Sequence, residues 1–247
     1  MPRRQKQSRE QNAYLIIDSN SAHSVAEMVE DNSFLSPLVQ AGFRVSWVNR
    51  ILEVDTHVDR AEAVGRLMPY HEQAVREMGG SVERFWLCEQ THSALVVPVS
   101  GDRGGAPVPV ADGLCTNDPS VVLGVHVADC GALYIADPVN QAVAVVHSGK
   151  VGTEKNIMAA AIDRMQEEYG SDPSELIVVL APCIRPPAYE VDFAAEIKKQ
   201  AIAVGITEAH YHDCSICTTS APETYYSYRL EQGKTGRMIA LIALSSS

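Results

Sequence analysis

Apolar runs of strand length alternate with helix-like segments along most of the chain, and the pattern is clearest between residues 121 and 170. Residues 121–128 are almost continuously apolar, which suits a strand buried on both faces. Residues 133–136 and 142–146 are two more apolar runs, separated at 137–140 by Asp-Pro-Val-Asn, a turn composition. We therefore predict a buried strand followed by a β-hairpin.

Helical periodicity begins after the hairpin. Apolar residues recur every four positions from 157 to 169, with Thr153 as the expected N-cap and Gly170 as the expected stop. Pro69 marks a kink or boundary in an earlier helix. The same criteria predict strands at 14–17, 43–48, 85–88, 94–99, 177–180 and 238–244, and helices at 59–78 and 193–204.

The order of these elements predicts one α/β domain, α+β by some conventions, over residues 13–247. Mixed sheets with a central hairpin would be flanked by helices. Residues 1–12 carry charges and amides but almost nothing to bury, so we expect a disordered arm. The Gly/Pro-rich stretch 100–109 is expected to be a loop within the domain rather than a linker.

Composition narrows the function classes. The 247 residues are 46% hydrophobic and 21% charged, with a net charge of −11, so nucleic acid is not an expected partner. The longest apolar runs fall far short of the ~20 residues that cross a bilayer, and no membrane span is expected. A polar run at 5–12 stands where a signal peptide would have its apolar core, so we expect a cytoplasmic protein. The six cysteines would then be core residues, ligands or nucleophiles.

The predicted hairpin brings a cysteine and a histidine together. If 137–140 is its loop, Ala136 lies opposite Gln141, and Cys130 lies opposite His147. Directly opposed residues have Cβ atoms about 4.5 to 5.5 Å apart on one face of the sheet. A thiolate and an imidazole at that separation can share a metal ion.

A buried cysteine that faces a histidine is also compatible with ordinary core packing. His92 favours a functional site, because it lies in a polar Gln-Thr-His-Ser stretch after an apolar strand and supplies a third possible ligand. Two histidines and one cysteine with an open position are typical of catalytic zinc. The segment 210–217 is rich in His and Cys, but its single C-x-x-C is at most half of a zinc site.

A candidate anion site follows the hairpin, where a strand leads into a helix through glycines. Free backbone N–H groups and a lysine there could hold phosphate; the residues are Gly149, Lys150, Gly152 and Thr153. Arg185, Arg229 and Arg237 lie in loop-like contexts, where surface ion pairs are the ordinary explanation. Arg185 or Arg229 is an alternative basic group for the substrate.

Between about residues 86 and 244, a series of motifs in the same order resembles the laccase-domain family, also called YfiH-type or polyphenol oxidase proteins. The matching segments are QTHS (90–93), ADGLCT (111–116), VADC (127–130), HSGKVGT (147–153), LAPCIRPPAYEV (180–191) and YYSYRLEQGKTGRMIALI (225–242). The resemblance implies a YfiH-like fold and a zinc or copper ion bound by the residues that match the family's ligands, His92, Cys130 and His147.

The resemblance also implies phosphorolysis of purine nucleosides, with purine nucleoside and phosphate as substrates. In some members of the family this activity extends to methylthioadenosine and to adenosine deamination. Laccase chemistry itself fits poorly, because a multicopper oxidase needs many paired H-x-H motifs and this chain has eight histidines with a single H-x-H. Lys150 and Val151 replace the family's aromatic and basic pair, and its N-terminal signatures are missing from the first 80 residues.

Two alternatives stay open from the residues. Cys130 and His147 could form the nucleophile and base of a metal-free cysteine hydrolase. The chain could also be a metal-binding protein that has lost catalysis through the changes at Lys150 and Val151.

Overall fold

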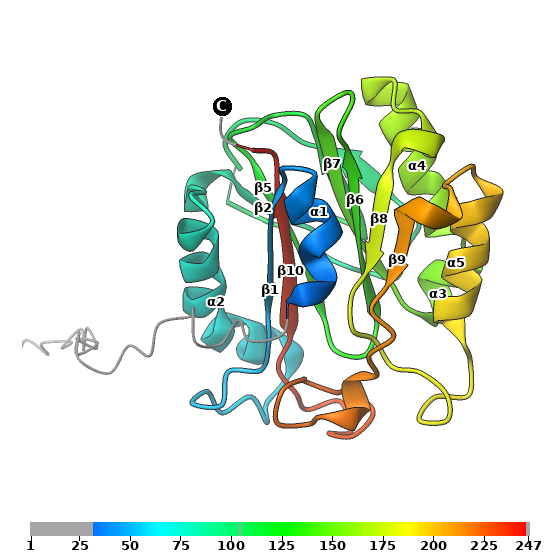
Figure 1. The fold of residues 1–247 in the computed structure, drawn as a ribbon. Coiled ribbons are helices and arrows are strands. Elements are labelled where there is room, and N and C mark those ends of the chain that lie inside the picture. Colours follow the sequence, from blue (N-terminus) through cyan, green and yellow to red (C-terminus); the bar gives the residue numbers. More distant parts are fainter. Residues whose placement is uncertain (1–31, 104, 246–247) are drawn as a thin grey trace, which may run out of the picture.

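Two β-sheets pack face to face between helices in the computed structural model, which describes residues 32–103 and 105–245. Figure 1 shows four layers, with α2 (Arg60–Glu77) on the outside of one sheet and α4 (Ile157–Tyr169) and α5 (Phe193–Ala203) on the outside of the other. Two short helices, α1 (Ser36–Gln40) and α3 (Lys150–Glu154), accompany them. Single 3-10 turns lie at Ser33–Leu35, Val82–Arg84, Pro173–Glu175, Glu208–His210 and Thr218–Ser220.

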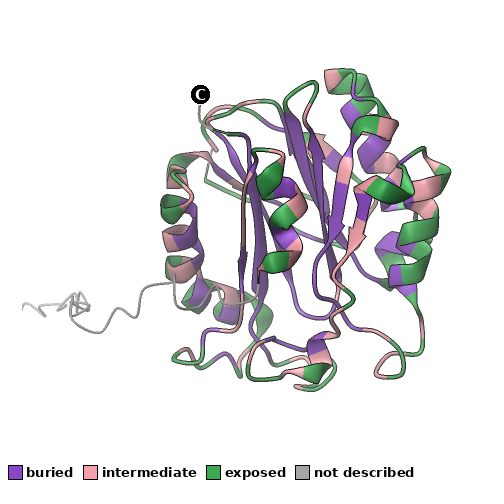
Figure 2. Ribbon diagram, viewed as in Figure 1, coloured by how far each residue is buried: buried purple, intermediate pink, exposed green. Residues whose placement is uncertain are grey.

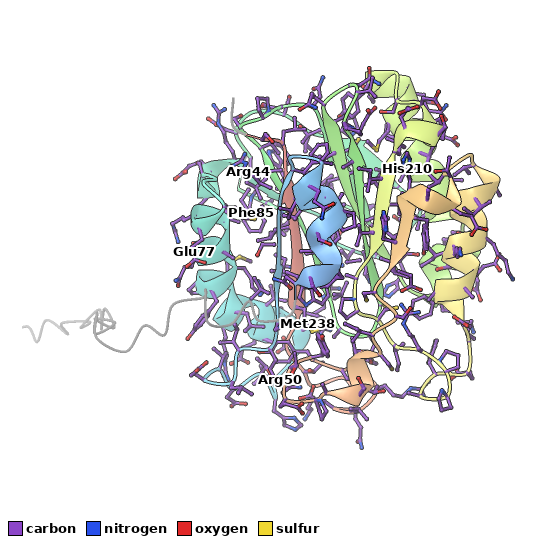
Figure 3. All side chains as sticks on the ribbon, viewed as in Figure 1. Arg44, Arg50, Glu77, Phe85, His210 and Met238 are labelled. Atoms are coloured by element: carbon purple, nitrogen blue, oxygen red, sulfur yellow. The ribbon has the colours of Figure 1, made fainter. Side chains whose placement is uncertain are left out.

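The smaller sheet has four strands in the order β1-β10-β5-β2. Their bounds are β1 Arg44–Val48, β10 Met238–Ala243, β5 Val122–Val127 and β2 Phe85–Leu87. β10 runs antiparallel to both β1 and β5, whereas β2 pairs with β5 in parallel. Arg44 ties this sheet to its surroundings, because its guanidinium donates to the carbonyl oxygens of Leu244 at 2.6 Å and Met78 at 2.8 Å (Figure 3).

The larger sheet has six strands in the order β3-β4-β7-β6-β8-β9. Their bounds are β3 Val96–Pro98, β4 Gly113–Thr116, β7 Ala142–Ser148, β6 Gly131–Asp137, β8 Ile177–Leu180 and β9 Tyr211–Asp213. The central strands β4, β7, β6 and β8 pair antiparallel, and the edge strands β3 and β9 pair in parallel. Both sheets are mixed, as the sequence predicts.

Side chains of β6 alternate between two cores, as the two-residue period of a strand requires. Tyr134 and its even-numbered neighbours pack against the smaller sheet, whereas Leu133 and Ile135 pack under α4 and α5. The Tyr134 hydroxyl donates to the Ser46 carbonyl at 2.8 Å and so links the two sheets. Figure 2 shows the central strands buried along almost their whole length, while each long helix buries one side.

The long elements agree with the sequence-based prediction and the ends differ by a residue or two. α2 has Asp59 as its N-cap, with the Asp59 carboxylate accepting from the Glu62 amide at 3.0 Å. Of the two alternatives predicted for Pro69, a kink or a boundary, the boundary is wrong, because α2 continues through this residue. The backbone carbonyl that loses its partner is that of Gly65 on the exposed side of the helix, where water can replace the missing N–H.

The predicted helix from Thr153 is divided in two. α3 starts at Lys150, and Asn156 then adopts a left-handed conformation with φ of 56° and caps α4. Thr153 is therefore not the N-cap of the long helix, because an Asn reaches the left-handed region at lower cost and offers a capping oxygen. Gly170 ends α4 with φ of 71°, as predicted.

The hairpin register is shifted from the prediction by two residues. Ala136 pairs with Val143 rather than Gln141, and Asp137 extends the strand by pairing with Ala142. The Asp137 carboxylate accepts from the amides of Val139 and Asn140, both at 2.9 Å, and this side-chain turn moves the loop one residue further along the chain.

Three short elements, α1, β4 and β9, were not predicted, because their segments are too short to show a period. The predicted arm at 1–12 and strand at 14–17 lie outside the described residues. Within the described part of the chain, none of the helices combines the length and apolar character that a bilayer crossing requires.

Gly124 is the close-packed point of the smaller sheet and gives a test of this core. A Cβ there would lie 2.7 Å from Phe85 and 3.0 Å from Leu241. Gly124→Ala should therefore lower the free energy of unfolding by about 1–3 kcal/mol, measured by urea denaturation.

The matched control is Gly65→Ala on the exposed side of α2, where an added Cβ meets nothing within 4 Å. This change should raise the free energy of unfolding by about 0.5–1 kcal/mol, because alanine favours helix. Equal effects of the two substitutions would contradict the packing described for Gly124.

Candidate active site

Four chain segments meet at one end of the sandwich, where β5 and β7 end and β6 and β10 begin. Met238, the first residue of β10, marks this end in Figure 3. His92 lies in the loop between β2 and β3, Cys130 in the turn between β5 and β6, and His147 near the end of β7. The candidate ligand atoms of these three side chains all lie within 4.8 Å of one another.

The structure brings Cys130 and His147 together despite the wrong register. In the observed pairing His147 lies opposite Ala132, and Cys130 precedes the first residue of β6. A shift of two residues keeps every side chain on its face, whereas a shift of one would have separated the pair. Cys130 and His147 are therefore diagonal neighbours rather than directly opposed residues.

Asp112 organises this cluster, and the sequence analysis assigned it no role. Its fully buried carboxylate accepts from His147 Nδ1 at 2.8 Å and from the backbone amides of Thr91 at 3.0 Å, His92 at 3.1 Å and Ser93 at 2.6 Å. The loop wraps so tightly around it that His92 adopts φ of 59°. Burial raises the pKa of Asp112, but its bonds to His147 and Ser93 lower it further, so the carboxylate is ionised.

The bond from Asp112 fixes the chemistry of His147. Because Nδ1 donates to the carboxylate, Nε2 is the nitrogen left for a metal or a proton. Burial raises the pKa of the Cys130 thiol, but the His147 and His92 imidazoles lower it further, to about 6. A thiolate is the form in which cysteine binds metals and acts as a nucleophile.

A cavity of about 420 Å³ opens onto the cluster. Aromatic and apolar side chains from the β8–α5 connection and the C-terminal segment form one part of its lining, namely Ile184, Tyr189, Phe193 and Tyr228. Cationic side chains form another part, namely Arg60, Lys150, Arg229 and Arg237. The cavity therefore offers an apolar surface, positive charge and the His/Cys cluster to one ligand.

Only some of the predicted anion-binding residues line the cavity. Lys150 and Arg229 line the cavity, and Gly149 packs so closely on Cys130 that a Cβ would overlap the sulfur. Gly152 and Thr153 are buried, and the Thr153 amide and hydroxyl are bonded to Gly149 O and Ser148 Oγ.

Arg185 is not among the cavity-lining residues. Its guanidinium makes a two-pronged bond to the Asp213 carboxylate at 2.5 and 3.0 Å. This is the ion pair that its loop context suggests. The cysteines and histidines of 210–217 belong to no candidate metal cluster of the described residues.

Two buried polar residues hold the turns around the site. Gln90 pairs both ends of its side-chain amide with the backbone of His126, at 2.6 and 2.9 Å. The Asp129 carboxylate accepts from the hydroxyls of Thr218 at 2.6 Å and Ser227 at 3.0 Å, which ties the C-terminal segment to the Cys130 turn. Asp129 directly precedes Cys130 and Gln90 lies two residues before His92, and this closeness to a predicted ligand is the sequence signal that could have identified them.

Comparison with known proteins identifies the family. The family described as "Multi-copper polyphenol oxidoreductase laccase" matches residues 50–198 and 191–245. The chain belongs to this family.

Similar curated proteins carry a more specific name. The purine nucleoside phosphorylase YlmD of Bacillus subtilis is 29% identical over 214 residues, which cover 72% of this chain and 77% of that protein. A purine nucleoside phosphorylase of Deinococcus radiodurans is 30% identical over 191 residues, covering 68% and 73%. The crystal structure of YlmD from Geobacillus stearothermophilus has a similar fold, with a TM-score of 0.76, 23% identity, and coverage of 83% of this chain and 93% of that chain.

The cluster fits a single metal ion better than the several implied by the family's description. His92, Cys130 and His147 form one candidate group among the described residues. Two imidazoles and a thiolate, with a cavity on the remaining side, are the donor set of a catalytic zinc site. The Asp112–His147 bond is the outer contact that such a ligand normally has.

Asp112 should matter for metal affinity although it would not touch the ion. Asp112→Asn keeps the shape but removes the charge that orients His147 and the loop at His92. We expect zinc affinity to fall by about 10- to 100-fold, measured by competition with a chromogenic chelator.

Asp163→Asn, an exposed carboxylate on α4, provides the control and should bind zinc as the wild type does. Wild-type affinity in Asp112→Asn would mean that the carboxylate has only a structural role.

Proposed function

We propose that this family member is a zinc-dependent purine nucleoside phosphorylase, which cleaves adenosine-, inosine- or methylthioadenosine-type substrates with phosphate. The observation that carries the proposal is the cavity in which the His92, Cys130 and His147 cluster adjoins both aromatic and cationic side chains. The names of the similar proteins support the same reaction.

Each part of the cavity suits one part of the substrates. A purine is flat and apolar on its faces, so the exposed ring of Tyr228 can stack on it, while the buried Phe193 contributes to the apolar wall. The positive charge of Lys150 and Arg229 at the same cavity favours the anionic co-substrate. Zinc held by the cluster would act as a Lewis acid on a substrate oxygen, with copper as the alternative ion.

The protein's own groups prepare the site for that ion. Asp112 orients the His147 ring, and the two imidazoles stabilise the Cys130 thiolate. Lys155 donates to the His92 carbonyl at 2.6 Å and so fixes the loop from the side of α3. Ligand geometry is thereby set before a substrate arrives, which is what catalysis by positioning requires.

The three ligands give the first test. Removing any ligand of a three-ligand site removes most of its affinity, so His92→Ala, Cys130→Ala and His147→Ala should each carry far less than one zinc per chain by elemental analysis. Cys214→Ala serves as the control, since Cys214 lies outside the cluster, and should retain its metal. Full zinc content in all three ligand variants would exclude the site.

The reaction itself gives the second test. Release of free base from adenosine or inosine should increase with phosphate concentration and yield ribose 1-phosphate, measured by chromatography. Cys130→Ala prepared in parallel detects contaminating enzymes. Base release independent of phosphate would indicate hydrolysis, and ammonia without base would indicate deamination.

The geometry also favours one second candidate, a metal-free cysteine hydrolase. Cys130 would be the nucleophile and His147 the base, with Asp112 as the carboxylate that orients the base. His92 beside the same thiol is better explained by metal binding, because such a hydrolase has no need of a second imidazole. Activity that survives complete removal of metal would favour the hydrolase.

A further inference from the structure

Two arginines line the cavity without a carboxylate partner among residues 32–103 and 105–245. Arg60, the first residue of α2, donates to the carbonyl oxygens of Glu89 at 3.1 Å and Gln90 at 3.4 Å. Arg237 lies just before β10 and donates through Nη1 to the carbonyls of Thr235 at 2.9 Å and Gly236 at 2.8 Å. Backbone oxygens position both guanidinium groups, and no carboxylate of the described residues forms an ion pair with either.

The other cations of this region differ in that respect. Arg229 pairs with Glu190 at 2.8 Å and lies over the Tyr189 ring, 4.9 Å from its centroid. Lys150 approaches the Glu154 carboxylate at 4.0 Å. Arg60 and Arg237 therefore offer more uncompensated positive charge than the residues that the sequence analysis selected.

The lack of a carboxylate partner is energetically most unfavourable at Arg237, because this side chain is buried. The side chain is only 9% exposed, and Gly236 packs so tightly on the Tyr226 ring that a Cβ there would overlap it. Burial and the nearby Arg60 charge lower the pKa of Arg237, and the smaller opposing effects of Cys130, Tyr228 and Asp129 do not reverse this direction. A buried cation next to a second cation destabilises the empty site unless an anion enters it.

Asp129 is the one carboxylate that the described residues contribute to the cavity lining, and it does not serve as that anion. Asp129 makes no ion pair within the described residues, and its oxygens accept from Thr218, Ser227 and the Arg229 amide. Those bonds satisfy the carboxylate with neutral donors. The charge of the two arginines is therefore available to a ligand.

We propose that Arg60 and Arg237 form the phosphate subsite of this cavity. Guanidinium groups suit the role, because their planar donors match phosphate oxygens in pairs. Arg60 is held by carbonyls of the same loop that carries His92 two residues later. The loop therefore sets the spacing between the anion and the His/Cys cluster.

This inference rests on the proposed phosphorolysis and specifies how it starts. A phosphate oxygen held by the two arginines forms the bond to C1′ of the ribose while the bond from C1′ to the base nitrogen breaks. The electron pair of the broken bond goes to the base, and the proton of hydrogen phosphate neutralises it. The products are ribose 1-phosphate and the free base, so atoms and charge balance.

The test measures the binding of phosphate in two independent ways, on the zinc-loaded protein. Arg60→Gln and Arg237→Lys should each raise the KM for phosphate about ten- to hundred-fold, with the zinc content and the nucleoside KM unchanged. Calorimetric titration with inorganic phosphate alone should show the same loss of affinity. Arg66→Gln, an exposed residue of α2 paired with Glu62, removes the same charge and should behave as wild type.

The outcomes separate the two proposals. Phosphate binding that disappears in the arginine variants, in a protein that cleaves no nucleoside, would keep the subsite and overturn the proposed function. Wild-type phosphate affinity in Arg60→Gln and Arg237→Lys would overturn the subsite, and loss in Lys150→Ala alone would move it to α3. If Arg237→Lys fails to fold by circular dichroism, Arg60→Gln alone decides, because its side chain is exposed and its removal leaves the core intact.

Discussion

The buried carboxylate of Asp112 is the interaction on which the site depends. It accepts four N–H groups, from the His147 ring and from three successive amides of the loop that carries His92. An ionised carboxylate without such donors would cost several kcal/mol at this depth. The loop and the histidine therefore stay in place because the alternative is an unpaired buried charge. One residue thus fixes both the position of His92 and the ring nitrogen that His147 presents.

The sequence was sufficient to predict Cys130 and His147 together, although the predicted pairing was wrong. Strand patterns define which face a residue occupies more strongly than they define its partner, because the apolar face must stay buried. Asp137 moved the turn by one residue on each strand, and the parity survived. His92 could be suspected only from its polar surroundings, since a loop has no period.

Asp112, Arg60 and Arg237 could not be predicted in their roles, for a physical reason. Asp112 is 35 residues from His147, and Arg60 is about 30 residues from the loop that holds it. The Asp112–His147 contact arises from the pairing of β4 with β7, and the Arg60 contacts arise from the position of α2 beside the loop after β2. No local sequence pattern encodes either of these long-range contacts. Arg185, to which the sequence did point, forms an ion pair with Asp213, a residue that is distant in sequence.

Backbone strain concentrates where these polar contacts are densest. Gln90, His92, Val110 and Asp129 all have positive φ, between 59° and 79°, although none is a glycine. Each such residue costs about 1–3 kcal/mol, and a β-branched valine is especially unfavourable there.

Hydrogen bonds hold each strained position. Val110, for example, accepts from the hydroxyls of Thr91 and Ser93 through its carbonyl and donates its amide to Glu89 at 2.8 Å. The strain is therefore offset by contacts within the protein. Because hydrogen bonds already hold the loop that carries His92, the binding interactions with a substrate can be applied to orienting the reacting groups.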